Sequence, residues 1–298
     1  MNFIQSVKKA LILVLILFLV SCGSRTKEAA DHTAGIHEID FTGAEELPFD
    51  VHAHAYLVVR LNDFKVLYRM NDTEEIYPAS LTKILTMDTV LRNARDLEDT
   101  SSYSSAQYWE LIDANASVAG LWSDTGYTLE ELLYALVLPS GADAAKALEN
   151  YFSDEGRDLV DLMNENAKRI GMDHSHFTNT TGLHDDDFYT TLDDLLKLIL
   201  DALSYEKGRE VLETLSYRSS RSGSYTSTVL PVDNSYVEVL GGKTGFTGQA
   251  GQNIIVLFRH EDRSYLLILS GAMGDPGRRQ YYHYEDALNI FEYMGGGN

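Results

Sequence analysis

Short runs with the pattern of β-strands lie near both ends of the chain. In the first run, apolar side chains alternate with other side chains, as expected for a strand that packs one face against a core. The runs cover residues 54–61, 65–70, 236–246, 253–259 and 265–270. Polar turns separate the first pair and the last pair, so the pattern predicts a hairpin near the start and three strands near the end.

The middle of the chain repeats its apolar residues with the period of an α-helix. Helices are predicted at residues 80–91, 129–138, 142–152, 154–170, 191–203 and 280–293. Thr128 and Glu131 have the spacing of a capping box ahead of the second helix, and Pro139 ends that helix. The polar, Ser-rich stretch 92–125 predicts loops with a few short helices or strands.

Two strands, a helical insert, three strands and a final helix predict an α+β fold with one five-stranded antiparallel sheet. In this sheet the first hairpin pairs with the last three strands, and helices cover both faces. A length of 298 residues with 44% hydrophobic residues is sufficient for a full core. We expect one domain over residues 49–298, with no second domain after Gly271.

The N-terminus has the pattern of an export signal. Two lysines precede an unbroken apolar run over residues 10–20, which is too short to span a membrane comfortably. The run ends in a leucine, a valine, a serine and Cys22, which resembles the lipobox of bacterial lipoproteins, where the cysteine carries the lipid. We expect a signal peptide at 1–21, a lipid anchor on Cys22 and a flexible tether at 22–48. The protein would then be attached to the outer face of the cytoplasmic membrane, the alternative being a plain secretory signal beside an incidental cysteine.

The chain carries a formal net charge of −21, which argues against nucleic acid as a partner and gives no attraction to anionic lipid headgroups. Any membrane attachment must therefore come from the lipid and not from a basic patch. Cys22 is the only cysteine, so no intramolecular disulfide can form.

Ser80 and Lys83 are the candidate reactive pair. Serine followed three residues later by lysine occurs at four places in the chain, so the spacing alone carries little information. At Ser80 the context differs, because Pro78 favours a helix start and Lys83 is the only charged residue between Ser80 and Asp88. An amine in such an apolar segment loses hydration, which lowers its pKa toward that of a general base. An ordinary helix whose lysine reaches the surface is the alternative.

A second motif is Lys243-Thr244-Gly245, which lies in a glycine-rich strand. Glycine allows a ligand to approach closely, and the lysine and threonine offer a cation and a hydroxyl that suit a carboxylate. A third candidate, Ser140, lies in the tight turn between two predicted helices. Neither motif identifies a function by itself.

Together these motifs resemble those of the penicillin-binding proteins and serine β-lactamases. The matching segments are Pro78 to Thr86, Leu132 to Ala145, Phe177 to Asp194 and Lys243 to Gly251. They are most similar to one branch, the serine D-alanyl-D-alanine carboxypeptidases of low molecular mass (peptidase family S11), over residues 50–293. The resemblance implies a hydrolase that acts on peptidoglycan pentapeptide, is inhibited by β-lactam antibiotics and uses no cofactor or metal.

The resemblance also implies catalytic roles. Ser80 would attack the carbonyl between the two D-alanines, with Lys83 taking its proton. Ser140 would relay that proton to the leaving amine. The backbone N–H groups of Ser80 and Phe246 would form the oxyanion hole.

For substrate binding, the resemblance implies that Lys243 and Thr244, with Gly245, hold the terminal carboxylate. Lys243 would also place a second positive charge near Lys83. We expect this charge to lower the pKa of Lys83 further.

One residue departs from the family pattern. Asparagine is usual at the third place of the second motif, where this chain has Ala142, and loss of its amide costs about 1–3 kcal/mol. We therefore expect a slower but active enzyme. The alternative is a catalytically weak peptidoglycan-binding lipoprotein.

Two other enzyme classes are alternatives. A β-lactamase shares the motifs, but the glutamate and asparagine four residues apart that class A enzymes use do not occur between Phe152 and Thr191. A zinc peptidase is suggested by the pairs His52/His54 and His174/His176, but the chain has no His-Glu-x-x-His motif. Structural histidines are the simpler interpretation of both pairs.

Overall fold

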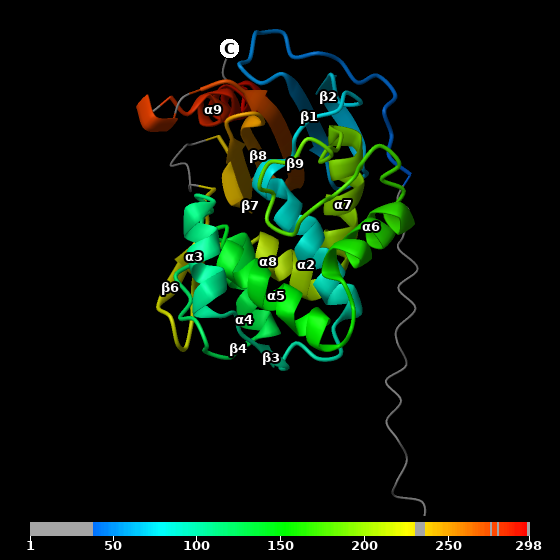
Figure 1. Ribbon diagram of the computed structural model, residues 1–298. Coiled ribbons are helices and arrows are strands. Elements are labelled where there is room, and N and C mark those ends of the chain that lie inside the picture. Colours follow the sequence, from blue (N-terminus) through cyan, green and yellow to red (C-terminus); the bar gives the residue numbers. More distant parts are fainter. Residues whose placement is uncertain (1–37, 230–235, 275, 279, 297–298) are drawn as a thin grey trace, which may run out of the picture. The chain divides into compact units, whose positions relative to one another are not determined.

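A five-stranded antiparallel sheet with the strand order β2-β1-β9-β8-β7 is the frame of the protein (Figure 1). Its strands are β1 (Ala55–Arg60), β2 (Lys65–Met70), β7 (Glu238–Thr247), β8 (Gly251–His260) and β9 (Arg263–Ala272). The computed structural model describes residues 38–229, 236–274, 276–278 and 280–296. The first hairpin joins the last three strands through pairing of β1 with β9, which confirms the predicted sheet and the α+β fold class.

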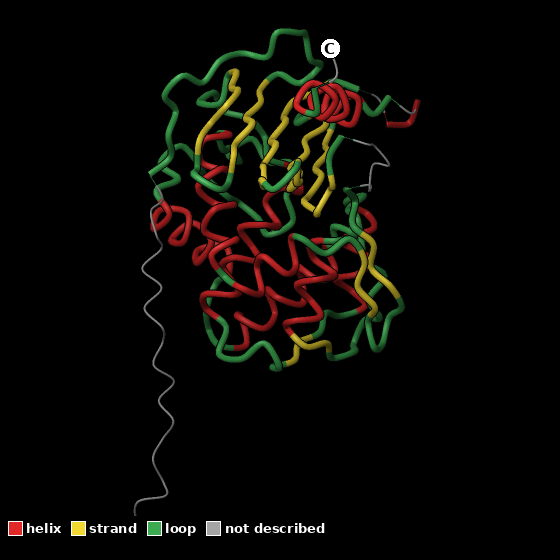
Figure 2. The backbone as a smooth tube through the Cα atoms, turned by 180° about the vertical axis from the view of Figure 1, so that it is seen from behind, coloured by secondary structure: helices red, strands yellow, loops and turns green. Residues whose placement is uncertain are grey.

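The two faces of the sheet pack against two separate apolar cores. On β1, Leu57 and Val59 belong to one core, while Tyr56 and Val58 belong to the other. This division follows from the period of two in a strand, which turns successive side chains to opposite faces. The helix α9 (Tyr282–Met294) lies over the second face, and the helices between β2 and β7 lie on the first (Figure 2).

The helical layer lies between β2 and β7 in the sequence. Its helices are η1 (Ala79–Leu81), α2 (Thr82–Asn93), α3 (Ser105–Asp113), α4 (Leu129–Val137), α5 (Ala142–Asp154), α6 (Leu159–Ile170), α7 (Leu192–Ser204) and α8 (Glu206–Leu212). Two short strand pairs accompany them, β3 (Thr100–Ser101) with β4 (Tyr127–Thr128), and β5 (Ser216–Arg218) with β6 (Ser224–Thr226). A further 3-10 turn, η2 (Pro276–Arg278), precedes α9. Every predicted helix is present, with shifted ends.

Local hydrogen bonds explain why the observed ends of some helices differ from the predicted ends. Asp158 accepts hydrogen bonds from two backbone N–H groups of the following turn, so α6 begins later than the predicted residue 154. Thr128 caps α4 as predicted, but the Glu131 carboxylate accepts from the Ser219 hydroxyl, so the expected capping box is not closed. Sequence patterns did not predict α8 or the β5–β6 hairpin.

Residues 38–48 pack along the outer edge of β2. Asp40 and Glu45 form parallel bridges with Lys65 and Tyr68, and Leu47 is buried. These contacts cover an edge strand whose backbone groups would otherwise be unpaired. The predicted flexible tether is therefore wrong for residues 38–48. The predicted signal peptide, Cys22 and the rest of the tether lie outside the described residues.

A β-bulge connects the sheet to the start of the helical layer. The register between β8 and β9 shifts so that Asn253 faces Ser270 and Gly271. Its side-chain oxygen accepts from the Ser270 hydroxyl and the Gly271 N–H, both at 2.9 Å. Its side-chain nitrogen donates to the carbonyl oxygens of Tyr77 (2.9 Å) and Pro78 (3.2 Å). One buried amide thus fixes the chain directly before η1 to the sheet.

Replacement of Asn253 by alanine leaves four polar groups without this partner. We expect Asn253→Ala to lower the free energy of unfolding by about 3 kcal/mol, measured by urea denaturation. The matched control is Asn62→Ala, since Asn62 accepts one hydrogen bond from the Ser264 N–H on an exposed turn. We expect the control to cost less than about 1 kcal/mol. Equal effects of the two changes would contradict the anchoring role of Asn253.

Candidate active site

Ser80 lies in the 3-10 turn η1, immediately before α2. Pro78 precedes the turn, and its restricted φ suits a helix start, as predicted. Two glycines press against the turn. A Cβ atom at Gly182 would lie 2.0 Å from the carbonyl oxygen of Ala79, and one at Gly245 would lie 3.1 Å from the backbone nitrogen of Ser80. Gly182 has a φ of 78° and a side chain there would clash with the turn, while a Cβ at Gly245 would make a tighter contact than usual. Ser80 is therefore held closely between β7 and the segment around Gly182.

Lys83 is the hydrogen-bond partner of the Ser80 hydroxyl. Its Nζ lies 3.1 Å from Ser80 Oγ and donates to the carbonyl oxygen of Thr181 at 2.5 Å. The residue is only 2% exposed. Burial lowers the pKa of Lys83 to about 7, and the nearby Asp143 carboxylate opposes this shift. Near neutral pH a large share of the amine is therefore unprotonated and can accept the Ser80 proton.

Lys243 on β7 is a second buried amine in the same region. Its Nζ donates to the carbonyl oxygen of Thr244 at 2.8 Å. Burial lowers the pKa of Lys243, and repulsion from Lys83 lowers it further. The expected repulsion between the two lysines is thus present, and it lowers the pKa of Lys243. At Lys83 the shift of the pKa comes from burial and is opposed by the Asp143 carboxylate.

Ser140 occupies the tight turn between α4 and α5, as predicted. Its backbone φ is 64°, in the left-handed region, and its side chain is 5% exposed. The Ser140 hydroxyl has no hydrogen-bond partner within the part of the chain that the structure describes. A buried hydroxyl costs free energy unless it is paired, so Ser140 Oγ is available to a group that enters from outside.

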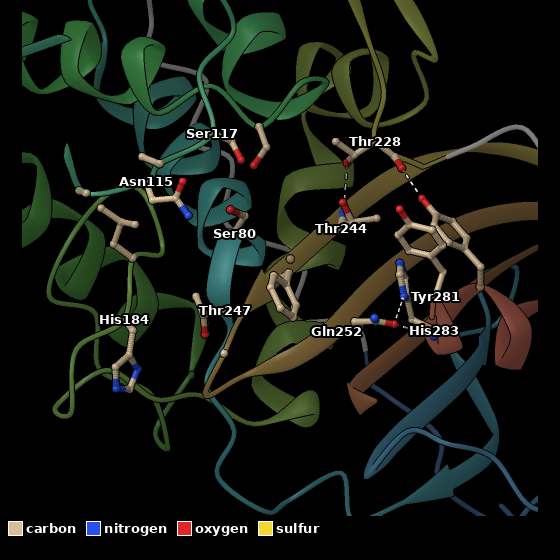
Figure 3. Close-up of a pocket in the computed structure, with 18 residues that line it drawn as sticks. Ser80, Asn115, Ser117, His184, Thr228, Thr244, Thr247, Gln252, Tyr281 and His283 are labelled. Atoms are coloured by element: carbon tan, nitrogen blue, oxygen red, sulfur yellow. Dashed lines mark hydrogen bonds between the residues drawn. The ribbon is translucent and has the colours of Figure 1, made fainter. Parts of the chain in front are cut away.

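The predicted residues meet at one open pocket of about 950 Å³ (Figure 3). Those that line it are Ser80, Ser140, Thr244, Gly245 and Phe246. Lys83 and Lys243 are joined to this lining by their hydrogen bonds to Ser80 and to the Thr244 carbonyl. A hydroxyl beside an unprotonated amine can support acyl transfer through a covalent serine intermediate. Cys22 lies outside the described residues, so nothing relates it to the pocket.

Sequence reasoning missed much of the remaining lining. Asn115 and Ser117 come from the loop after α3, while Thr228, Gln252 and His283 come from distant parts of the chain. The ring Nδ1 of His283 lies 2.6 Å from the side-chain oxygen of Gln252, and burial lowers the pKa of His283 to about 4. The ring is therefore neutral at physiological pH. No periodicity or motif marks these positions, because each becomes a neighbour of Ser80 only in the folded chain.

The histidine pairs considered for zinc lie elsewhere. His52 stacks on Tyr282, and His54 contacts Glu74. Among the described residues that line the pocket, none belongs to either pair. Within the described ranges, no group of three or more His, Cys, Asp or Glu side chains could hold a metal ion. In the same ranges, no helix has the length and apolar character needed to cross a membrane.

Residues 41–272 match the family model described as D-alanyl-D-alanine carboxypeptidase, peptidase family S11. The chain belongs to this family. It is 27% identical over 205 residues to the D-alanyl-D-alanine carboxypeptidase DacF of Bacillus subtilis (strain 168), a match that covers 66% of this chain and 52% of that protein. It is 26% identical over 230 residues to the D-alanyl-D-alanine carboxypeptidase of Streptomyces sp. (strain K15), over 72% of this chain and 77% of that protein.

The fold of this S11 family member agrees with a solved structure. The crystal structure of the Streptomyces K15 DD-transpeptidase aligns with a TM-score of 0.73 at 22% identity, over 84% of this chain and 99% of that chain. At this identity the likeness shows the fold alone. The chain spans about half to two thirds of the length of the first curated relatives that it matches.

The lowered pKa of Lys83 predicts how the reactivity of Ser80 depends on pH. The unprotonated amine accepts the proton, and its fraction rises as the pH passes through about 7. We expect the rate of Ser80 acylation by a labelled penicillin to rise about tenfold from pH 6 to pH 8 and then to level off. Lys83→Arg is the control, because a guanidinium does not lose its proton in this range and should abolish the reaction. A wild-type rate that still rises steeply above about pH 9 would show that Lys83 has the pKa of an ordinary lysine, which would contradict the prediction.

Proposed function

We propose that this protein is a serine D-alanyl-D-alanine carboxypeptidase that removes the terminal D-alanine from peptidoglycan stem peptides. The observation that carries the proposal is the hydrogen bond between Lys83 and Ser80 Oγ, together with the lowered pKa of Lys83. Membership of a family described by this activity supports the choice of substrate. The proposed reaction is a hydrolysis that needs no cofactor.

In the proposed reaction, Lys83 removes the proton of Ser80 as Oγ attacks the carbonyl carbon between the two D-alanines. The carbonyl oxygen becomes an oxyanion, and the backbone N–H groups of Ser80 and Phe246 are its proposed donors. Ser140 then passes the proton from Lys83 to the leaving nitrogen, so D-alanine departs and an ester remains on Ser80. Water hydrolyses the ester and restores the free serine. The unpaired Ser140 hydroxyl at the pocket supports the relay.

Lys243, Thr244 and Gly245 are the proposed site for the terminal carboxylate of the substrate. Thr244 and Gly245 line the pocket, and Lys243 is hydrogen-bonded to the Thr244 carbonyl. In the free protein burial disfavours the charged form of Lys243. An entering carboxylate favours that form, because an opposite charge stabilises the ammonium.

Ala142 is the reason to propose a slow enzyme. It is 1% exposed at the start of α5, and its backbone N–H donates to the Ser117 carbonyl oxygen at 2.8 Å. Its methyl group offers no hydrogen bond to Lys83 or to a substrate. One missing hydrogen bond of this kind lowers the rate by about one to two decades. A catalytically weak peptidoglycan-binding protein is the second candidate, and Ala142 is the observation that favours it.

Release of D-alanine from a stem pentapeptide tests the proposed activity. We expect one D-alanine per pentapeptide, a tetrapeptide as the second product, and no release by Ser80→Ala. A chromogenic cephalosporin tests the β-lactamase alternative, and we expect slow turnover at most. Rapid cephalosporin turnover with intact pentapeptide would overturn the proposal. Acylation by penicillin without any release of D-alanine would favour the weak binding protein.

We further propose that the protein is an exported lipoprotein, anchored through Cys22 to the outer face of the cytoplasmic membrane. The support is the sequence pattern, in which a charged start, the apolar run 10–20 and a lipobox-like ending precede Cys22. Residues 1–21 would be removed, and residues 22–37 would serve as the tether.

Metabolic labelling with a radioactive fatty acid tests the anchor. We expect the full chain to incorporate label and to sediment with membranes, because acyl chains supply the membrane affinity that this acidic protein lacks. Cys22→Ser should incorporate no label. A Cys22→Ser protein that still incorporates the fatty acid, or a full chain that incorporates none, would contradict the lipid anchor.

A further inference from the structure

We propose that Asn115 is a substrate-binding residue, which pairs with the backbone amide on the N-terminal side of the residue whose carbonyl Ser80 attacks. This inference rests on the proposed function. Asn115 lines the same pocket as Ser80 and Ser140, although the sequence places it in an irregular stretch. In Figure 3 Asn115 and Thr244 lie on opposite sides of Ser80, with the Asn115 amide turned toward the serine. A carboxamide offers both a donor and an acceptor, which is what a peptide bond requires.

The loop that carries Asn115 is fixed by its backbone. The Asn115 N–H donates to the Ile112 carbonyl oxygen at 2.9 Å, and the Ser117 carbonyl oxygen accepts from the Ala142 N–H at 2.8 Å. Asn115 has a φ of 53°, a left-handed conformation that asparagine adopts more readily than most residues. Within the described chain its side chain is exposed and makes no hydrogen bond. The Asn115 amide therefore lies at the pocket without a hydrogen bond to the rest of the described chain.

An extended peptide has two hydrogen-bonding edges, and the pocket must pair both. β7 is the last strand in the order of the sheet, and Thr244 and Gly245 on it line the pocket, so this strand can pair with one edge of the peptide. The other edge of the peptide would face the loop 114–117, which lines the pocket and whose Ser117 carbonyl accepts from the Ala142 N–H. Asn115 can donate to a peptide carbonyl there and accept from a peptide N–H. The neighbouring loop thus provides the amide that Ala142 lacks.

Two β-lactams, one with and one without a side-chain amide, test this role. Benzylpenicillin carries a side-chain amide beside its reactive ring, and 6-aminopenicillanic acid has the same ring without that amide. Asn115→Gly removes the carboxamide and tolerates the left-handed backbone. We expect it to slow acylation of Ser80 by benzylpenicillin about tenfold. Acylation by 6-aminopenicillanic acid should change less than about twofold, because no amide contact is lost.

Glu261→Gly is the matched control, because Glu261 also has a left-handed φ, 52°, on the exposed turn between β8 and β9. It should leave both rates unchanged. Equal slowing of both compounds by Asn115→Gly, or no slowing with benzylpenicillin, would overturn the role of Asn115 while the proposed function stands. A wild-type protein that reacts with neither compound would instead overturn the proposed function.

Discussion

The burial of an amine beside a serine hydroxyl is the constraint on which the rest of the structure depends. The pKa of Lys83 falls to about 7 because the surrounding protein removes its hydration. The Ser80 hydroxyl must then be held within reach of that amine, at 3.1 Å. The sheet does this through Asn253, which binds the two carbonyl groups before η1. Gly182 and Gly245 let the neighbouring segments close on the turn.

The charges around the pair are arranged so that the amine can remain neutral. The Asp143 carboxylate accepts hydrogen bonds from the backbone N–H groups of residues 119–121 and does not form an ion pair with Lys83. A direct ion pair would raise the pKa of Lys83 and remove its capacity as a base. Lys243, also buried, is repelled by Lys83 when both amines are charged. A substrate carboxylate would offset that repulsion, which links recognition of the substrate to the two buried amines.

The sequence predicts those features that neighbouring residues determine. Pro78 and the apolar residues after it indicate the helix that carries Ser80 and Lys83, and the turn at Ser140 follows from the residues around it. Asn253 and Asn115 could not be found in this way, because their partners are distant in sequence. The same reason explains the error at residues 38–48, whose polar composition indicates a tether but whose backbone pairs with β2.

The central claim is that Ser80 forms a covalent acyl-enzyme. Mass spectrometry of the protein after exposure to benzylpenicillin tests it most directly. The predicted result is one adduct with the mass of the intact penicillin, located on the peptide that contains Ser80 and absent from Ser80→Ala. An adduct that persists in Ser80→Ala, or the absence of any adduct when Ser80 is intact, would contradict the claim.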